Sequence, residues 1–225
     1  MDTAVSFQPE RQAMVEEQLR VRGIRDPRVL AAMAAVPRHE FVPENQIRAA
    51  YADRALPIGP WETISQPFIV ALMTEAAAVH PGDRVLEVGT GTAYQAAILA
   101  HLGGRVYTIE MNPELAEDAR ARLQRLGYGD AVEVVTGDGS QGYAAAAPYD
   151  AILVTAASPA VPRPVIDQLA EGGRLVIPIG SRQEQELELI TKMGGATFIR
   201  PLTACQFVPL IGKEGWSGAG GWQIL

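Results

Sequence analysis

The sequence contains very little cysteine and histidine, and this scarcity limits the chemistry it can support. Of the 225 residues only Cys205 is a cysteine, which excludes an intramolecular disulfide and a multi-cysteine metal site. The three histidines, His39, His80 and His101, are far apart and lack the spacing of metal ligands. We therefore expect no metal site, and the cysteine usage favours a reduced, cytoplasmic protein.

Long apolar runs and a surplus of basic residues are also missing. No stretch approaches the roughly 18 apolar residues that a membrane-spanning helix needs, and residues 1–10 do not resemble a secretory signal. The formal net charge of −7 disfavours nonspecific binding to nucleic acid. Hydrophobic residues make up 48% of the chain, enough for a sizeable core. We expect a soluble cytoplasmic monomer with neither membrane nor nucleic acid as a partner.

The first 80 residues differ from the rest in their pattern of apolar residues and prolines. Residues 10–22 have apolar side chains at helical spacing and predict an amphipathic helix. Asp26-Pro27 is typical of a helix start, with the aspartate as N-cap and proline at the first helical position. Prolines then recur up to residue 60 and favour an irregular segment. We predict three parts: an N-terminal helical region (1–80), a core (81–212) and a C-terminal tail (213–225).

From residue 83 onward, short apolar strands alternate with helices. This alternation predicts an α/β fold with a mostly parallel, doubly wound sheet, whose ligands bind beyond the carboxyl ends of the strands. Two later segments predict a closing antiparallel pair. The predicted strands are residues 84–88, 106–109, 132–135, 151–154 and 174–179, the predicted helices are 93–102, 112–126 and 164–170, and the predicted closing pair is 187–191 with 206–210.

A glycine-rich loop follows the first predicted strand of the core, in the segment Glu87-Val-Gly-Thr-Gly-Thr-Ala93. Glycine at 89 and 91 permits positive φ and lets a ligand approach the backbone. The spacing fails for a dinucleotide binder, because Tyr94 stands where the last Gly or Ala is needed. A phosphate-binding P-loop fails as well, since no Gly-Lys-Ser/Thr follows. The loop instead resembles the cofactor loop of class I methyltransferases.

Acidic residues stand at the ends of the next two predicted strands. Glu110 ends residues 106–109, where a carboxylate can accept both hydroxyl hydrogens of a ribose. Asp138, in Gly137-Asp-Gly139, can accept from an adenine amine, although an ordinary Asp-Gly turn explains the same residues. Together these carboxylates would favour a sulfonium cation.

A polar segment, Thr63-Ile-Ser-Gln-Pro67, precedes an apolar helix predicted over residues 68–79. The simpler interpretation is a capping box formed by Thr63 and Gln66, with Pro67 in the first turn. The alternative is that the Ser65 hydroxyl faces the crevice and binds a substrate group. Both can hold, because capping needs only one of the two hydroxyls.

Motifs along nearly the whole chain, from about residue 14 to 216, resemble the protein-L-isoaspartate (D-aspartate) O-methyltransferase family. The Thr-Ile-Ser-Gln-Pro element is particular to that family, whereas the glycine loop is shared by many methyltransferases. The matching segments include Met14-Val-Glu-Glu-Gln-Leu-Arg20, Val36-Pro-Arg-His-Glu-Phe-Val-Pro43, Ala50-Tyr-Ala-Asp-Arg-Ala-Leu-Pro-Ile-Gly59, Thr63-Ile-Ser-Gln-Pro-Phe-Ile-Val-Ala71, Tyr107-Thr-Ile-Glu110, Val154-Thr-Ala-Ala157 and Phe207-Val-Pro-Leu210.

The resemblance implies a Rossmann-like class I methyltransferase core that binds S-adenosylmethionine and releases S-adenosylhomocysteine. It implies methyl transfer to the free carboxylate of L-isoaspartyl residues, and of D-aspartyl residues as a second substrate, which starts repair through a succinimide. Ser65 matches the active-site serine. The expected cofactor-binding residues are Glu87, Gly89, Thr90, Gly91, Glu110, Met111, Asp138 and Gly139, and the expected substrate-binding residues are Ile64, Ser65, Gln66, Val208, Pro209 and Leu210.

Three departures from the family pattern stand out. Ala93 takes the place of a third loop glycine, Trp61-Glu62 replaces the usual Gly-Gln, and the tail from Gly215 to Leu225 has no match. Other functions remain open: methylation of a nucleic acid or a small molecule, or a non-catalytic cofactor-binding module. A base-methylating enzyme typically has Asn/Asp-Pro-Pro-aromatic after strand four, where this chain has Val154-Thr-Ala-Ala-Ser-Pro159.

Overall fold

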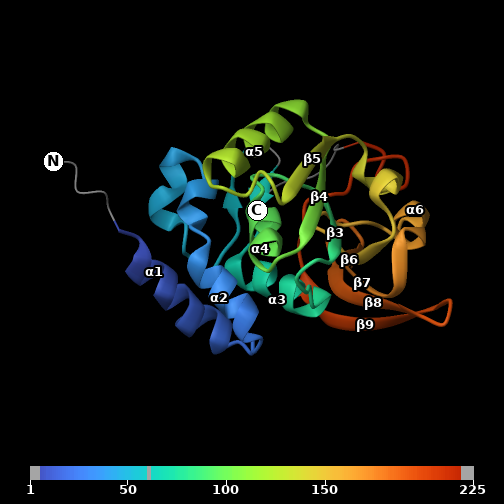
Figure 1. The fold of residues 1–225 in the computed structure, drawn as a ribbon, viewed down its shortest axis with the longest axis horizontal. Coiled ribbons are helices and arrows are strands. Elements are labelled where there is room, and N and C mark those ends of the chain that lie inside the picture. The colour runs from blue at the N-terminus through green and yellow to red at the C-terminus, as the bar shows by residue number, and fades with distance from the viewer. Residues whose placement is uncertain (1–5, 60–61, 219–225) are drawn as a thin grey trace.

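A seven-stranded sheet forms the centre of the molecule (Figure 1). The computed structural model describes residues 6–59 and 62–218. The strand order is β5-β4-β3-β6-β7-β8-β9; the first five strands are parallel, and β8 and β9 are each antiparallel to the preceding strand. The strands are β3 (Arg84–Val88), β4 (Arg105–Glu110), β5 (Val132–Thr136), β6 (Tyr149–Val154), β7 (Leu169–Gly180), β8 (Gln185–Met193) and β9 (Ala196–Cys205).

The two faces of the sheet are covered unequally. Helices α3 (Pro67–Ala77), α4 (Tyr94–His101) and α5 (Pro113–Arg125) pack on one face, together with the N-terminal helices. The other face carries the short helix α6 (Arg163–Asp167) and the 3₁₀ turns η4 (Gly139–Gln141) and η5 (Ala144–Ala146). The predicted Rossmann-like architecture, with its antiparallel strand pair, is confirmed.

The N-terminal region lies beside α3 and α4, at the left of Figure 1. The Asp26 carboxylate accepts a hydrogen bond from the Arg28 N–H at 2.8 Å and caps α2, which confirms the predicted helix start. Before α2, the short helix α1 continues directly as the π-helix η1, and the two cover most of the predicted amphipathic segment. The helical elements of this region are α1 (Gln8–Ala13), η1 (Met14–Arg20), α2 (Pro27–Ala35), η2 (Arg38–Phe41) and η3 (Glu44–Ala49). They are followed by strands β1 (Leu56–Pro57) and β2 (Thr63–Ile64), which form a small antiparallel sheet.

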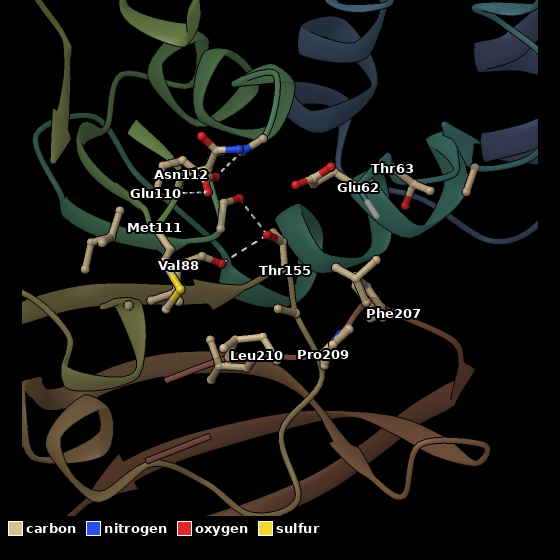
Figure 2. A pocket seen from close by; sticks show the side chains of 18 of the residues that line it. Glu62, Thr63, Val88, Glu110, Met111, Asn112, Thr155, Phe207, Pro209 and Leu210 are labelled. Carbon is tan, nitrogen blue, oxygen red and sulfur yellow. Dashed lines mark hydrogen bonds between the residues drawn. The ribbon is translucent and has the colours of Figure 1, made fainter. Parts of the chain in front are cut away.

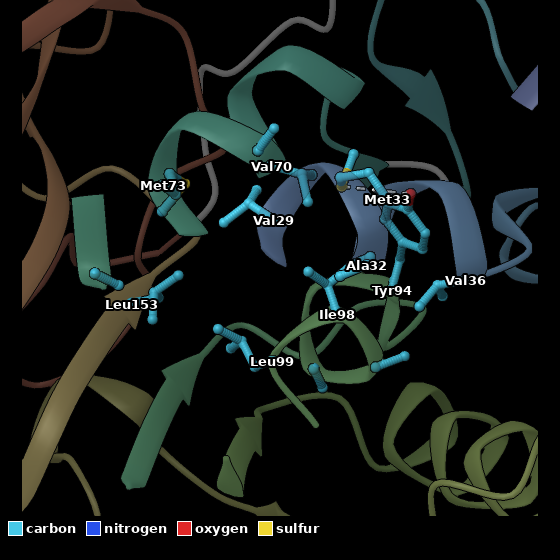
Figure 3. Close-up of a cluster of buried hydrophobic side chains, with 14 of the residues drawn as sticks. Val29, Ala32, Met33, Val36, Val70, Met73, Tyr94, Ile98, Leu99 and Leu153 are labelled. Atoms are coloured by element: carbon cyan, nitrogen blue, oxygen red, sulfur yellow. Dashed lines mark hydrogen bonds between the residues drawn. The ribbon is translucent and has the colours of Figure 1, made fainter. Parts of the chain in front are cut away.

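This region shares one hydrophobic core with the sheet. Figure 3 shows Met33 of α2, Val70 of α3, Ile98 of α4 and Leu153 of β6 in a single cluster. These side chains are no more than 2% exposed. Each large apolar side chain buried in this way contributes about 1.5–3 kcal/mol. Any segment tied to α2 and α3 is therefore held rigidly against the sheet.

The predicted closing pair was half right. Residues 187–191 do lie in β8, but the antiparallel partner is β9 rather than residues 206–210. The Gly194-Gly195 turn, with positive φ at both glycines, makes β8 and β9 a tight hairpin. Residues 206–210 lie after the hairpin and make only a single bridge, from Pro209 to Ala157. They are consequently outside the sheet's main ladder and reach the cavity described below.

Two local predictions were wrong. Thr63 forms no capping box, because it lies in β2 and α3 begins at Pro67 after Gln66, without a side-chain cap. Pro67 does occupy the first turn, as predicted. The helix predicted over 164–170 ends at Asp167, since Leu169 already pairs with Tyr149 in the sheet.

Candidate active site

A cavity of about 440 Å³ opens at the carboxyl ends of β3, β4 and β6, where the strand order reverses. Figure 2 shows Glu110 and Asn112 on one side and Thr63 and Phe207 on the other. The wall is more apolar than polar. The lining residues are Ala55, Glu62, Thr63, Val88, Gly89, Gly91, Ile109, Glu110, Met111, Asn112, Gly139, Thr155, Ala156, Gln206, Phe207, Val208, Pro209, Leu210 and Ile211.

The side chain of Thr155 holds the glycine loop in place through hydrogen bonds. Its hydroxyl donates to the carbonyl oxygens of Gly89 at 2.7 Å and Val88 at 3.0 Å (Figure 2). Gly89 has φ +96°, and a β-carbon there would lie 2.5 Å from the Thr155 hydroxyl oxygen. Both facts require glycine at this position, as the sequence predicted. The sequence-based site omitted Thr155, although its position directly after a predicted strand was a usable signal.

Glu110, at the end of β4, lines the cavity. Its Oε2 accepts from the Gly91 N–H at 2.9 Å, and its Oε1 accepts from the Asn112 N–H at 3.0 Å. The carboxylate is therefore oriented by two backbone donors before any ligand binds. Carboxylate oxygens have further lone pairs, so hydroxyl groups of a ligand can still donate to Glu110.

Glu87 does not line the cavity but lies fully buried behind the loop. Its Oε2 accepts from the Thr108 hydroxyl at 2.5 Å, and Thr108 is 2.7 Å from the Thr90 hydroxyl. Burial raises the pKa of Glu87 to about 8, although the Thr108 hydrogen bond opposes the rise. At neutral pH the side chain is mostly protonated, and it is linked through the Thr108 hydroxyl to Thr90 on the buried side of the loop.

Asp138 and Gly139 follow β5, and only Gly139 lines the cavity. A β-carbon at Gly139 would overlap Val88, so the wall is thin here. The Asp138 carboxylate accepts from the N–H and hydroxyl of Ser140 and from the Lys213 N–H. Burial opposes ionisation, but these donors outweigh it and lower the pKa of Asp138. Asp138 thus ties the loop after β5 to the C-terminal segment.

The opposite wall is formed by Thr63 and by residues 206–211. Ser65 is half-buried near the start of α3 and does not itself line the cavity; its carbonyl accepts from Arg38 at 2.7 Å. Ile64 is buried in the core, and the Gln66 amide donates to the Asp53 side chain at 2.7 Å. The sequence missed Thr63, Phe207 and Gln206 as lining residues, because the course of this segment depends on packing.

Of the predicted residues, eight are brought together around the cavity. They are Gly89, Gly91, Glu110, Met111, Gly139, Val208, Pro209 and Leu210. The predicted residues that do not line the cavity are Ile64, Ser65, Gln66, Glu87, Thr90 and Asp138.

Two further searches concern the described residues alone. Within residues 6–59 and 62–218, no three or more His, Cys, Asp or Glu side chains are grouped as metal ligands would be. Among the helices of this part of the chain, none has both the length and the apolar character needed to cross a bilayer. The departure noted at Trp61 lies outside the described residues, as does the part of the tail after residue 218.

The open parallel sheet, the glycine loop after β3 and the acid at the end of β4 define a Rossmann-like class I methyltransferase. Comparison with known proteins makes the assignment narrower. The family described as protein-L-isoaspartate(D-aspartate) O-methyltransferase matches residues 9–215. The chain belongs to this family.

Named relatives agree with the family. A protein-L-isoaspartate O-methyltransferase of Methanoculleus marisnigri is 56% identical over 209 residues, which cover 93% of this chain and 94% of the relative. A solved structure of the same name is 29% identical and has a TM-score of 0.83, covering 92% of this chain and 67% of its own. A Plasmodium falciparum structure, titled as a complex with S-adenosyl-L-homocysteine, is 27% identical with a TM-score of 0.78, covering 89% and 98%.

Proposed function

We propose that the cavity is where this enzyme of the protein-L-isoaspartate O-methyltransferase family transfers a methyl group from S-adenosylmethionine to the free carboxylate of an isoaspartyl residue. The same carboxylate chemistry extends to the side chain of a D-aspartyl residue. One observation carries the proposal: a single cavity is lined by the loop after β3 and Glu110 on one side and by Thr63 and residues 206–211 on the other. This gives room for a donor and an acceptor side by side.

The cofactor half has a donor set that fits a nucleoside with a cationic sulfur. Glu110 lines the cavity as an acceptor for ribose hydroxyls, and the backbone at Gly89 and Gly91 lies open to close approach. Met111 and Gly139 offer apolar contact for a base, and a free lone pair of Asp138 is the proposed acceptor for its amine. When bound, S-adenosylmethionine supplies an electrophilic methyl group and leaves as S-adenosylhomocysteine.

The acceptor half is proposed to bind a carboxylate. Thr63 lines the cavity and Ile64 is buried. Side chains alternate along an extended segment, which supports Ser65 being turned to the same side as Thr63. We assign Ser65 as the residue that donates to the acceptor carboxylate, beside the Gln66 backbone. Val208, Pro209 and Leu210 supply apolar contacts to the acceptor's chain.

The reaction needs no general base from the protein. A carboxylic acid with a pKa near ~4 is ionised at neutral pH and is already a nucleophile. The chain must strip water from this carboxylate and align it with the methyl group, which lowers the entropic part of the barrier. The mostly apolar wall of the cavity favours the removal of water, and Ser65 would align the carboxylate. The backbone nitrogen of the isoaspartyl linkage then attacks the methyl ester and expels methanol, which forms a succinimide whose hydrolysis returns some normal aspartate.

The division of the chain follows from this proposal. Residues 1–80 supply the acceptor segment with Thr63 and Ser65, and residues 81–212 supply the cofactor-binding residues together with the apolar acceptor contacts at 208–210. The tail from residue 213 has no assigned role. The proposed partners are isoaspartyl peptides and proteins, met by a monomer in the cytoplasm without nucleic acid or membrane.

The test uses methyl-labelled S-adenosylmethionine with paired peptides that differ only in a normal or an isoaspartyl linkage. We expect base-labile label on the isoaspartyl peptide alone. Equal label on both peptides, or label on added nucleic acid or small acceptors instead, would contradict the proposal. Ser65→Ala should lower kcat/KM for the peptide, with Thr197→Ala on the exposed part of β9 as a matched control. Full turnover by Ser65→Ala would remove Ser65 from the site.

A further inference from the structure

Arg38 is the largest fully buried side chain of the described residues, and none of the functions above uses it. It opens the 3₁₀ turn η2 and has no exposed surface. Burial lowers the pKa of Arg38 to about 10, which still leaves the guanidinium positively charged at neutral pH. A buried charge of this kind is costly unless its donors are satisfied.

The partners of Arg38 are carbonyl groups rather than a carboxylate. Nε donates to the Ala50 carbonyl and Nη2 to the Ser65 carbonyl, each at 2.7 Å. The guanidinium carbon lies 4.9 Å from the centroid of the Tyr94 ring. Nη1 is buried without a partner among the described residues, and none of the ion pairs among them includes Arg38.

The buried Arg38 side chain is not expected to increase the stability of the fold. A buried charge with no counter-charge and one unsatisfied donor is usually no better than an apolar side chain of similar volume. The guanidinium of Arg38 lies against the ring of Tyr94, which a methionine could contact equally well. The two carbonyl contacts therefore point to a role in backbone placement.

The contact to Ser65 fixes the orientation of one peptide group. The Ser65–Gln66 peptide is planar and trans, so its N–H points away from its C=O. Because the carbonyl is held by Arg38, the Gln66 N–H is directed away from Arg38. The residue on the nitrogen side of this peptide is fixed as well. The Gln66 side-chain amide donates to the Asp53 carbonyl at 3.0 Å and to the Asp53 carboxylate at 2.7 Å.

We propose that Arg38 is a positioning residue for the acceptor carboxylate: it holds the Ser65 carbonyl and so presents the Ser65 hydroxyl and the Gln66 N–H to that carboxylate. The buried positive charge also polarises the shared peptide group, which makes its N–H a stronger donor. This inference rests on the proposed function in one respect, the assignment of the acceptor to the side of the cavity near Thr63.

The central test compares Arg38→Met with the wild type. Methionine keeps the length and apolar packing but loses both carbonyl contacts. We expect KM for an isoaspartyl peptide to rise about 10- to 100-fold, because a charge-assisted hydrogen bond that orders the site is lost. The dissociation constant for S-adenosylhomocysteine, measured by calorimetry, should stay within about threefold, since Arg38 does not line the cavity.

Controls separate positioning from a general loss of structure. Arg28→Met removes another arginine that donates to a backbone carbonyl, that of Val79 at 3.1 Å, and should leave peptide KM unchanged. Arg38→Lys keeps the charge but can reach only one carbonyl well, so its KM should lie between wild type and Arg38→Met. In Arg38→Ala, guanidinium chloride at tens of millimolar, far below denaturing levels, should restore activity, whereas sodium chloride should not.

Two results would overturn the inference. One is an unchanged peptide KM with activity lost only in proportion to the unfolded fraction. The other is a crystal structure of Arg38→Met with S-adenosylhomocysteine in which the Ser65–Gln66 peptide is oriented as in the wild type. Failure of the proposed function is a different outcome, since wild-type protein would then not label the isoaspartyl peptide, and the crystal structure would still test Arg38. If Arg38→Met does not fold, the KM of Arg38→Lys and the guanidinium rescue of Arg38→Ala test the inference instead.

Discussion

The carboxylate of Glu110 accepts a hydrogen bond from the backbone N–H of Gly91 at 2.9 Å, which joins the end of β4 to the glycine loop after β3. The two strands are neighbours in the sheet, so this contact closes the loop against the adjacent strand end. One side chain therefore shapes the loop and also faces the cavity.

Glu110→Gln should weaken binding of S-adenosylhomocysteine about 10- to 100-fold, because an amide places a donor against either the Gly91 or the Asn112 N–H. Calorimetric titration measures the effect. Glu114→Gln, at an exposed glutamate in the first turn of α5, is the matched control. Equal affinity in the wild type and Glu110→Gln would show that the cofactor does not depend on this carboxylate.

Thr155→Val should reduce cofactor affinity about fivefold, since roughly 1 kcal/mol is expected from the hydroxyl that holds the Gly89 carbonyl. Thr155→Ser keeps the hydroxyl and should stay close to wild type. Dissociation constants of the two variants are compared by the same titration. If valine keeps the wild-type affinity while serine weakens binding, the methyl packing of Thr155 matters and its hydrogen bonds do not.

Ala93 precedes α4 in the left-handed region, with φ +68°, and is fully buried. Ala93→Gly relieves about 1–2 kcal/mol of backbone strain but removes a buried methyl worth about 0.8 kcal/mol, so stability should change little. Ala93→Val should lower the free energy of unfolding by at least about 2 kcal/mol, because β-branched residues fit this conformation poorly. Urea denaturation provides the measurement, and a well-tolerated valine would contradict the assigned backbone conformation.

Glu87 predicts a pH dependence of stability. Burial raises the pKa of Glu87 from its ordinary value of about 4.5 to about 8, so the folded protein retains a proton that the unfolded chain loses. The stability contributed by this group is complete below pH 4.5 and declines as pH rises to about 8, by up to a few kcal/mol at about 1.4 kcal/mol per pKa unit.

Glu87→Gln should remove that decline, so the variant gains stability relative to wild type as pH is raised from 5 to 9. Urea denaturation at several pH values measures the difference. Glu117→Gln, an exposed position on α5, serves as control. Parallel curves for the wild type and Glu87→Gln would mean that Glu87 titrates normally.

Local patterns were sufficient for the elements of the sheet. The predicted strand over residues 84–88 coincides with β3, and the helix predicted over 112–126 contains α5, which begins at the predicted proline and ends one residue early. Periodicity and capping are properties of neighbouring residues, so they survive in the sequence. The β8–β9 hairpin was missed because β9 is largely exposed and contains Arg200-Pro201, which hides its alternation, although Gly194-Gly195 was a turn signal.

By itself the sequence determined the parallel α/β core, the cofactor loop and the acid at the end of β4, because the alternation of strands with helices and the loop chemistry are written in contiguous residues. Tertiary structure alone decided how Thr155 supports Gly89, why Glu87 is buried behind the loop, and that Arg38 holds the Ser65 carbonyl across 27 positions of the chain. Those contacts join residues that are distant in sequence, and their geometry depends on how helices pack against the sheet, which no local pattern encodes.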